Sequence, residues 1–141
     1  MPDIPFKILA IEHVGIAVNS LDDLSNLFLN KLGLENTITE EVRDQKVITN
    51  IFNTGSGKLE LLKATEPNSP ISKFIDKKGE GIHHIALLID NLSAAIKYLD
   101  NEGIKLIDAE PRIGAEGYSI AFIHPKSTGG ILIELCEKNI H

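Results

Sequence analysis

The chain has 141 residues, of which 43% are hydrophobic and 24% are charged, and its formal net charge at pH 7 is −6. A chain of this length suits one compact domain, and no apolar run approaches the ~18 residues of a membrane span. The acidic balance argues against a nucleic-acid surface, which needs clustered Lys and Arg side chains.

The first half of the chain is predicted to fold as a strand, a helix and three further strands. A β-branched, aliphatic run predicts the first strand at about residues 8–18. A capping signal at Ser20 is followed by apolar residues at helical spacing, and the helix is expected to end at Gly33. The remaining strands are predicted at about residues 35–42, 45–53 and 58–64.

The second half repeats this order of elements. A strand at about residues 82–89 is followed by a helix that is capped by Asn91 and ends at Gly103. Three more strands are predicted at about residues 104–110, 117–124 and 130–137. Between the halves, residues 67–80 are predicted to form a linker with one short helix.

The two halves also share chemically distinctive residues. Ile11–Val18 and Ile82–Ile89 are aliphatic runs that each carry a histidine near the start. Lys58–Leu62 and Leu132–Cys136 each carry one glutamate among apolar residues. The duplicated residues are His13 with His84, which are 71 positions apart, and Glu60 with Glu134, which are 74 positions apart. An internal duplication that repeats both residue types indicates a pseudo-symmetric site.

These four residues predict a metal site. An ionised carboxylate inside an apolar strand is costly unless it is paired or bound to a metal ion. Two imidazoles and two carboxylates suit a six-coordinate divalent ion, with Co²⁺ preferred and Mn²⁺, Ni²⁺, Fe²⁺ or Zn²⁺ as alternatives. Four protein ligands would leave two positions open, as in a catalytic site. Of the two adjacent histidines, His84 aligns with His13, and His83 is expected to be structural.

The remaining chemistry-bearing residues are basic side chains and one cysteine. An anionic substrate would need a local basic patch, for which the candidates are Arg43, Lys46, Arg112 and Lys126. The single cysteine, Cys136, lies in an apolar run and is expected to be a buried small hydrophobe. Met1–Pro5 lacks a basic segment followed by an apolar core, so we expect no secretory signal and a cytoplasmic location.

The repeated order of elements and the His…Glu…His…Glu set resemble the vicinal oxygen chelate superfamily, which includes glyoxalase I, extradiol dioxygenases and bleomycin-resistance proteins. The resemblance extends over about Ile11–Glu137. Within the superfamily, Glu66–Ile71, Lys78–Ala86 and Phe122–Leu135 are most similar to the methylmalonyl-CoA epimerase family. The His-Pro-Lys-Ser…Gly-Gly run in the last segment distinguishes that family from glyoxalase I.

The resemblance implies an α+β fold in which two βαβββ repeats pair curved mixed sheets around a metal-containing cleft. The whole chain, 1–141, would then be one vicinal oxygen chelate domain, with repeats at about 8–64 and 81–137 and the linker helix at about 67–80. It implies a homodimer and one divalent ion per chain. The implied metal ligands are His13, Glu60, His84 and Glu134.

The resemblance also implies an activity, the interconversion of (2R)- and (2S)-methylmalonyl-CoA by C2 proton abstraction through a metal-stabilised enolate. Glu134 is then the expected base, because a monodentate ligand keeps one carboxylate oxygen available. The residues expected to contact the acyl-CoA substrate are His124, Lys126 and Ser127. Thr49 stands where some family members carry a second glutamate, so another group or a water replaces that base, or the activity differs.

Two other functions fit the same fold. A glyoxalase I-like lactoylglutathione lyase would use the same ion on a hemithioacetal. A non-catalytic ligand-binding protein would need an apolar or aromatic cleft, but the chain has no Trp and only two Tyr. Its complete ligand set also favours an enzyme over a binding protein.

Overall fold

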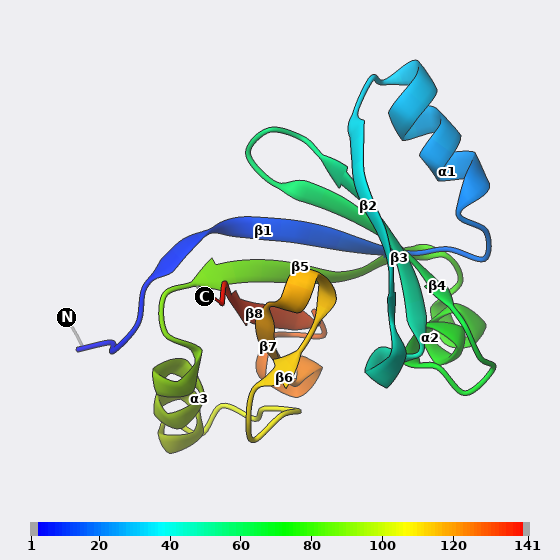
Figure 1. Cartoon of the computed structure of the whole chain (residues 1–141). Helices are drawn as coiled ribbons and strands as arrows, with labels where there is room; N and C mark the ends of the chain where they lie inside the picture. The colour runs from blue at the N-terminus through cyan, green and yellow to red at the C-terminus, as the bar shows by residue number, and fades with distance from the viewer. Residues whose placement is uncertain (1–2, 140–141) are drawn as a thin grey trace. The chain divides into compact units, whose positions relative to one another are not determined.

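The computed structural model describes residues 3–139, which form two compact units. The first unit runs from His13 to His83, and the second unit combines the described residues up to Glu12 with those from His84 onward. Strands β1 (Ile8–Ala17) and β5 (Gly81–Ile89) both cross this division (Figure 1). Each of these two strands therefore contributes residues to both units.

The first unit contains four strands in the order β2–β3–β4–β1. Strands β2 (Glu35–Val42), β3 (Val47–Asn53) and β4 (Lys58–Ala64) pair antiparallel, and β4 pairs parallel with β1. A short 3-10 helix, η2 (Arg43–Gln45), connects β2 to β3. The strands predicted for the first half are confirmed, with β3 starting two residues later than expected.

The first helix of the first unit has a widened last turn. Helix α1 (Asp22–Asn26) continues as a π-helix, η1 (Leu27–Lys31), and the Leu32 N–H donates to the Leu27 carbonyl at 2.9 Å. Phe28 in this turn is buried, and its ring meets the ring of Phe52 edge to face with 5.4 Å between centroids. The predicted helix is confirmed, but its N-cap is Leu21, not Ser20, and makes no side-chain capping hydrogen bond. The wide turn packs Phe28 onto one face of the sheet.

Helix α2 (Pro70–Lys78) follows β4 and packs against it. The fully buried Ser69 caps this helix, because its Oγ accepts a hydrogen bond from the Ile71 N–H at 3.1 Å. Gly79 ends the helix with a φ of 82°, a conformation that glycine adopts without steric cost.

The second unit repeats the strand pattern of the first. Its strand order is β5–β8–β7–β6, in which β5 and β8 (Ile133–Glu137) are parallel and the other pairs are antiparallel. Strand β6 (Arg112–Ile113) is short and β7 (Ser119–Ile123) is longer. Two 3-10 turns flank β7, and they are η3 (Ala115–Gly117) and η4 (Pro125–Ser127).

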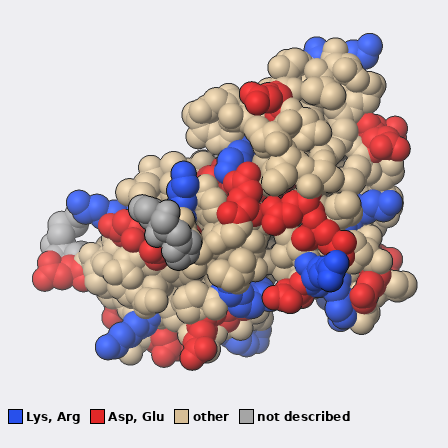
Figure 2. Space-filling model, in the orientation of Figure 1, with Lys and Arg blue, Asp and Glu red and all other residues tan. Residues whose placement is uncertain are grey.

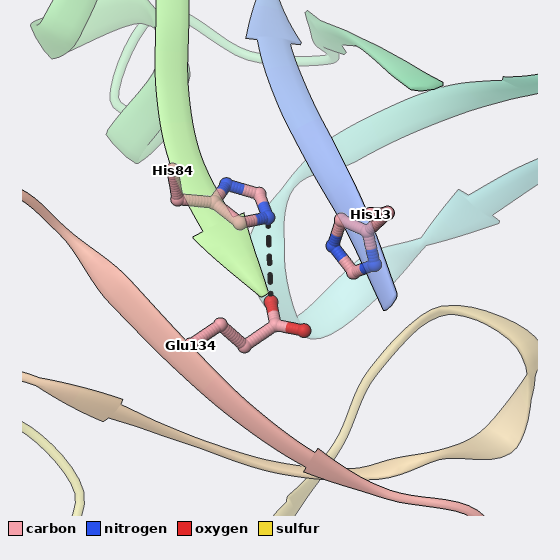
Figure 3. Close-up of side chains that lie close together, drawn as sticks. All are labelled: His13, His84 and Glu134. Atoms are coloured by element: carbon pink, nitrogen blue, oxygen red, sulfur yellow. Dashed lines mark ion pairs between the residues drawn. The ribbon is translucent and has the colours of Figure 1, made fainter. Parts of the chain in front are cut away.

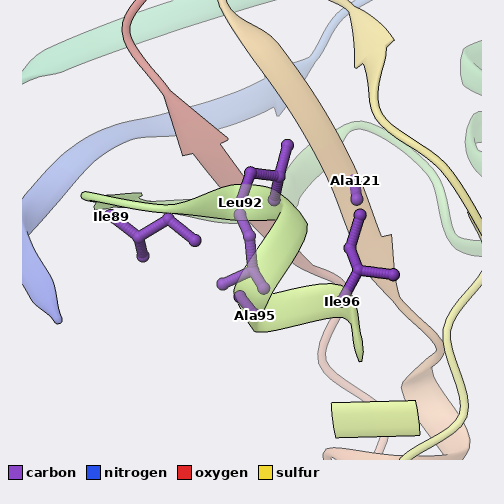
Figure 4. Close-up of a cluster of buried hydrophobic side chains, with 6 residues drawn as sticks. Ile89, Leu92, Ala95, Ile96 and Ala121 are labelled. Carbon is purple, nitrogen blue, oxygen red and sulfur yellow. The ribbon is translucent and has the colours of Figure 1, made fainter. Parts of the chain in front are cut away.

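Helix α3 (Leu92–Asn101) covers one face of the second unit. The predicted cap is confirmed, since the Asn91 Oδ1 accepts from the Ala94 N–H at 3.0 Å. The apolar side of the helix packs into a buried cluster (Figure 4), whose members are Ile89, Leu92, Ala95, Ile96, Ala121 and Leu135. None of the described helices is long and apolar enough to cross a membrane.

The strand predicted at residues 104–110 is wrong. In this segment Leu106 makes an isolated bridge to Ile123, and regular pairing resumes only at β6. The Asp108 carboxylate accepts the Phe122 N–H at 2.8 Å, so a side chain takes the place of a ladder carbonyl. Pro111 follows shortly afterwards and has no N–H to donate. These two residues explain why an apolar run here does not continue as a strand.

Candidate active site

One histidine–glutamate pair lies in the first unit. The Nδ1 atom of His13 on β1 is 3.1 Å from the Oε2 atom of Glu60 on β4, and the two residues are only 6% and 4% exposed. The parallel register places Gly15 opposite Glu60. Gly15 lies two residues after His13 on the same strand, so the two residues share a face of the sheet. Glu60 is opposite Gly15 and therefore lies on the face that carries His13.

A second histidine–glutamate pair lies in the second unit, where a different ring nitrogen faces the carboxylate. The Nε2 atom of His84 on β5 is 3.5 Å from the Oε1 atom of Glu134 on β8, as the dashed line in Figure 3 marks. These residues are 6% and 5% exposed, and the register places Ala86 opposite Glu134. The sequence duplication therefore extends to strand direction, register and burial of the two polar residues.

The chemistry of each pair fits a divalent metal ion. Each pair presents one imidazole nitrogen and one carboxylate oxygen at short range from a buried position. A buried carboxylate needs a charged or hydrogen-bonding partner, and a bound cation is one such partner. Imidazole and carboxylate donors together suit first-row divalent ions such as Co²⁺, Mn²⁺ or Zn²⁺.

The imidazole of His84 is packed by a small network within the second unit. The ring of Phe122 meets it edge to face, with 5.8 Å between centroids. Asp108 accepts from the Phe122 backbone and also pairs with Arg112, whose Nε is 2.8 Å from Oδ1. The Arg112 guanidinium lies over the Phe122 ring at 5.8 Å. Sequence reasoning missed Phe122 and Asp108, although an aspartate inside a presumed strand was a usable signal.

His83 has a different environment from its neighbour His84. Its ring meets Phe74 of α2 edge to face at 5.0 Å. Burial, and secondarily the positive charge of Lys78, lowers the pKa of His83 to about 4. A neutral ring packed against an aromatic side chain is consistent with the structural role expected for His83.

The three residues predicted to contact substrate lie together in and just before the η4 turn. The Nδ1 atom of His124 accepts from the Lys126 N–H at 3.0 Å, and the Ser127 Oγ accepts from the Lys105 N–H at 2.9 Å. These hydrogen bonds shape the turn. Lys126 itself is exposed, so its ammonium group is accessible for an anionic ligand.

The other basic candidates lie beside acidic residues. Lys46 Nζ is 3.7 Å from a Glu66 oxygen, and Arg43 Nε is 4.0 Å from a Glu41 oxygen. On the face shown in Figure 2, Lys and Arg side chains are interspersed with Asp and Glu side chains. The predicted burial of Cys136 is confirmed, and Thr49 is also buried.

Comparison with known proteins places this geometry in a family. Residues 12–122 match the model of the glyoxalase/bleomycin resistance protein/dioxygenase superfamily. The chain belongs to this superfamily. The predicted fold class is thereby confirmed as the vicinal oxygen chelate fold of that superfamily, with a βαβββ order in each half.

Several members of the superfamily are similar to this chain over most of its length. It is 46% identical to the uncharacterized protein YqjC of Bacillus subtilis, covering 90% of this chain and 91% of that protein. It is 38% identical to the mitochondrial methylmalonyl-CoA epimerase of Dictyostelium discoideum, over 91% of this chain and 78% of the relative. A Streptomyces coelicolor methylmalonyl-CoA epimerase variant, solved with 2-nitronate-propionyl-CoA, superposes with a TM-score of 0.88 at 31% identity, covering 95% of this chain and 100% of the other.

Proposed function

We propose that this protein is a metal-dependent epimerase that interconverts (2R)- and (2S)-methylmalonyl-CoA. The observation that carries the proposal is the buried histidine–glutamate pair, duplicated at one register in both units. Relatives and structures that bear the epimerase name over most of this chain support the substrate. An acyl-CoA is therefore the proposed small-molecule partner.

We propose that both pairs bind one divalent ion per chain, so that the ligands are His13, Glu60, His84 and Glu134. The donor chemistry suits first-row divalent ions, of which Co²⁺ is the proposed one, with Mn²⁺, Ni²⁺, Fe²⁺ or Zn²⁺ as alternatives. When bound, the ion would stabilise the negative charge that develops on the substrate oxygens after C2 loses its proton.

Glu134 is the proposed base for the C2 proton. Its carboxylate is buried beside His84, which holds it in place to accept a proton from a bound substrate. In the epimerisation, Glu134 takes the C2 proton from one face and the C–H electron pair moves into the enolate. A second acidic group or a water molecule then returns a proton to the opposite face, which inverts the centre. Lys126, together with the turn shaped by His124 and Ser127, is proposed to contact an anionic group of the substrate.

The assembly of the protein is also a proposal. We propose that the chain functions as one domain and as a homodimer, as the resemblance to the epimerase family implies. Size-exclusion chromatography with light scattering tests the dimer directly. A cytoplasmic location remains a prediction from the sequence.

A two-arm assay tests the activity. Metal-loaded protein is incubated with single-epimer methylmalonyl-CoA in D₂O, and separately with methylglyoxal and glutathione. We expect C2 deuterium incorporation and inversion in the first arm. Lactoylglutathione formation without any C2 exchange would replace the proposal with the lyase function, and inactivity in both arms would favour a binding protein.

Metal content tests the ligand assignment independently of turnover. Equilibrium dialysis against Co²⁺ should give about one ion per chain, and His13→Ala or His84→Ala should bind at least about tenfold more weakly. His83→Ala is the matched control, because it removes the neighbouring imidazole without removing a proposed ligand. Equal Co²⁺ content in all four proteins would refute the assignment.

A further inference from the structure

The orientation of the His84 ring depends on the side chains that surround it. Rotation about the Cβ–Cγ bond of a histidine has broad energy minima, so neighbouring groups decide the plane of the ring. A metal ion is bound through a nitrogen lone pair that lies in that plane. Partners that orient a ligating histidine commonly change metal affinity by about ten- to a hundredfold. The contacts of His84 within the second unit therefore bear on the proposed metal site.

The register of the second unit places Phe122 beside both members of the His84–Glu134 pair. Phe122 on β7 is directly opposite Glu134 on β8, and Ala86 on β5 is opposite Glu134 from the other side. Directly opposed residues share a face of a sheet, as do residues two apart in a strand, so His84, Glu134 and Phe122 lie on one face. Phe122 is 8% exposed, and its ring meets the His84 ring at an interplanar angle of 87°. This edge-to-face contact limits rotation of the imidazole.

The backbone of Phe122 also brings its side chain close to Glu134. Its N–H donates to the Asp108 carboxylate at 2.8 Å, and its carbonyl oxygen accepts from the Ile107 N–H at 2.8 Å. Both polar groups therefore point away from β8, and the Phe122–Glu134 pair is of the non-hydrogen-bonded type. Side chains are closest in such pairs, whose Cα atoms are about 4.5 Å apart, compared with about 5.5 Å in hydrogen-bonded pairs.

Asp108 and Arg112 hold Phe122 through its backbone and its ring. One oxygen of Asp108 accepts the Phe122 N–H, and the other is 2.8 Å from the Nε atom of Arg112. Arg112 is opposite Ile120, which lies two residues before Phe122, so Arg112 is on the same face of the sheet. Its guanidinium lies 5.8 Å from the centroid of the Phe122 ring. A single carboxylate, whose side chain is 9% exposed, thus fixes both the backbone of Phe122 and the cation over its ring.

The first unit has an aliphatic residue at the position equivalent to Phe122. Ile51 on β3 is opposite Glu60, as Phe122 is opposite Glu134. Ile51 is fully buried, but its side chain has no ring with which to meet His13 edge to face. The duplicated scaffold therefore surrounds its two histidine–glutamate pairs with different side chains.

We propose that Phe122, held by Asp108 and Arg112, is a positioning residue that orients the His84 imidazole for metal binding. This inference rests on the proposed metal site. The Phe122 ring restricts His84 to one orientation before the ion binds, and a ligand that is ordered in advance loses less conformational freedom on binding. Asp108 acts one step further away, because it holds Phe122 and not His84 itself.

Phe122→Ile tests the proposal, since it introduces the residue that the first unit has at the equivalent position. Competition with a chelator measures the affinity for Co²⁺, and visible absorption reports the ligand geometry around the bound ion. We expect the affinity to fall about three- to tenfold, the scale of one edge-to-face contact, and the Co²⁺ absorption bands to shift. Asp108→Ala should have a smaller effect in the same direction. Asp108→Asn keeps an oxygen for the Phe122 N–H and should recover part of that loss.

Phe28→Ile is the matched control, because Phe28 is also buried and meets Phe52 edge to face at 5.4 Å. Phe52 is opposite Leu59, the residue before Glu60, so this aromatic pair lies on the other face of the first unit's sheet. Phe28→Ile should lower the thermal unfolding temperature, as should Phe122→Ile, because both remove buried ring volume. It should leave Co²⁺ affinity and absorption unchanged, which separates positioning of a ligand from a general loss of packing.

Two results would overturn the role of Phe122. The first is wild-type Co²⁺ affinity and absorption in Phe122→Ile, and the second is equal weakening of Co²⁺ binding by Phe28→Ile. If Phe122→Ile does not fold, Asp108→Ala decides the question, and wild-type values for that variant would overturn the proposal. Failure of the proposed metal site looks different, because the wild-type protein itself would then bind no Co²⁺.

Discussion

The duplicated pairs allow the same substitution to be made at two matched carboxylates. Glu60→Gln and Glu134→Gln each replace a carboxylate by an amide of nearly the same shape. Both glutamates are at most 5% exposed, and each is paired with a histidine, at 3.1 Å for Glu60 and 3.5 Å for Glu134. Each change removes one negative charge from a proposed ligand while retaining an oxygen donor. The effects of the two substitutions on metal affinity should therefore be similar, which leaves base function as the difference between them.

We expect Glu134→Gln to slow inversion by at least about a hundredfold, which corresponds to about 2.7 kcal/mol of lost transition-state stabilisation. Glu60→Gln should stay within about tenfold of the wild type, since a neutral amide oxygen at that position can still bind the ion. The assay is inversion of single-epimer substrate at saturating Co²⁺, with metal occupancy measured on the same samples. Wild-type inversion by metal-loaded Glu134→Gln would refute the reasoning, as would equal losses in both variants.

Three other predictions concern substrate charge, protonation and helix capping. Lys126→Ala should raise KM, and the increase should shrink at high salt because exposed charges are screened; an unchanged KM would limit Lys126 to the turn. Folding lowers the pKa of His83 from 6.5 to about 4, so between these two pH values the folded state binds fewer protons than the unfolded state. The free energy of unfolding should therefore fall by up to about 3 kcal/mol as the pH decreases from 6.5 to about 4. Ring titration by NMR and urea unfolding of wild type and His83→Gln check this, and titration near 6.5 would contradict it. Ser69→Ala should lower the free energy of unfolding by about 1 kcal/mol through loss of the α2 cap, and an unchanged urea midpoint would show that the cap contributes little.

The sequence predicted those parts of the fold that depend on local periodicity. The helix after Asn91 and the strands that carry His13 and His84 follow directly from apolar spacing and a capping side chain. The segment around Asp108 does not, because a long-range side-chain hydrogen bond to Phe122 replaces the regular ladder there. A contact between residues so far apart in the sequence has no local pattern by which it could be recognised.

The same distinction applies to the site. The duplication identified all four members of the two buried pairs, because a histidine or glutamate in an aliphatic run stands out from its neighbours. Phe122, which packs against His84, did not stand out, because it is one of several apolar residues in β7.

The duplication also explains how a nearly symmetric scaffold can support an asymmetric step. Each unit supplies a histidine and a glutamate at one register, so the proposed ligand set is two-fold symmetric in chemistry. Epimerisation needs acid–base groups on two faces, but those groups need not come from equivalent strands. Glu134, the proposed base, comes from β8, the strand that pairs parallel with β5. In this proposal metal binding depends on all four residues that the duplication repeats, while base function is assigned to only one of the two repeated glutamates.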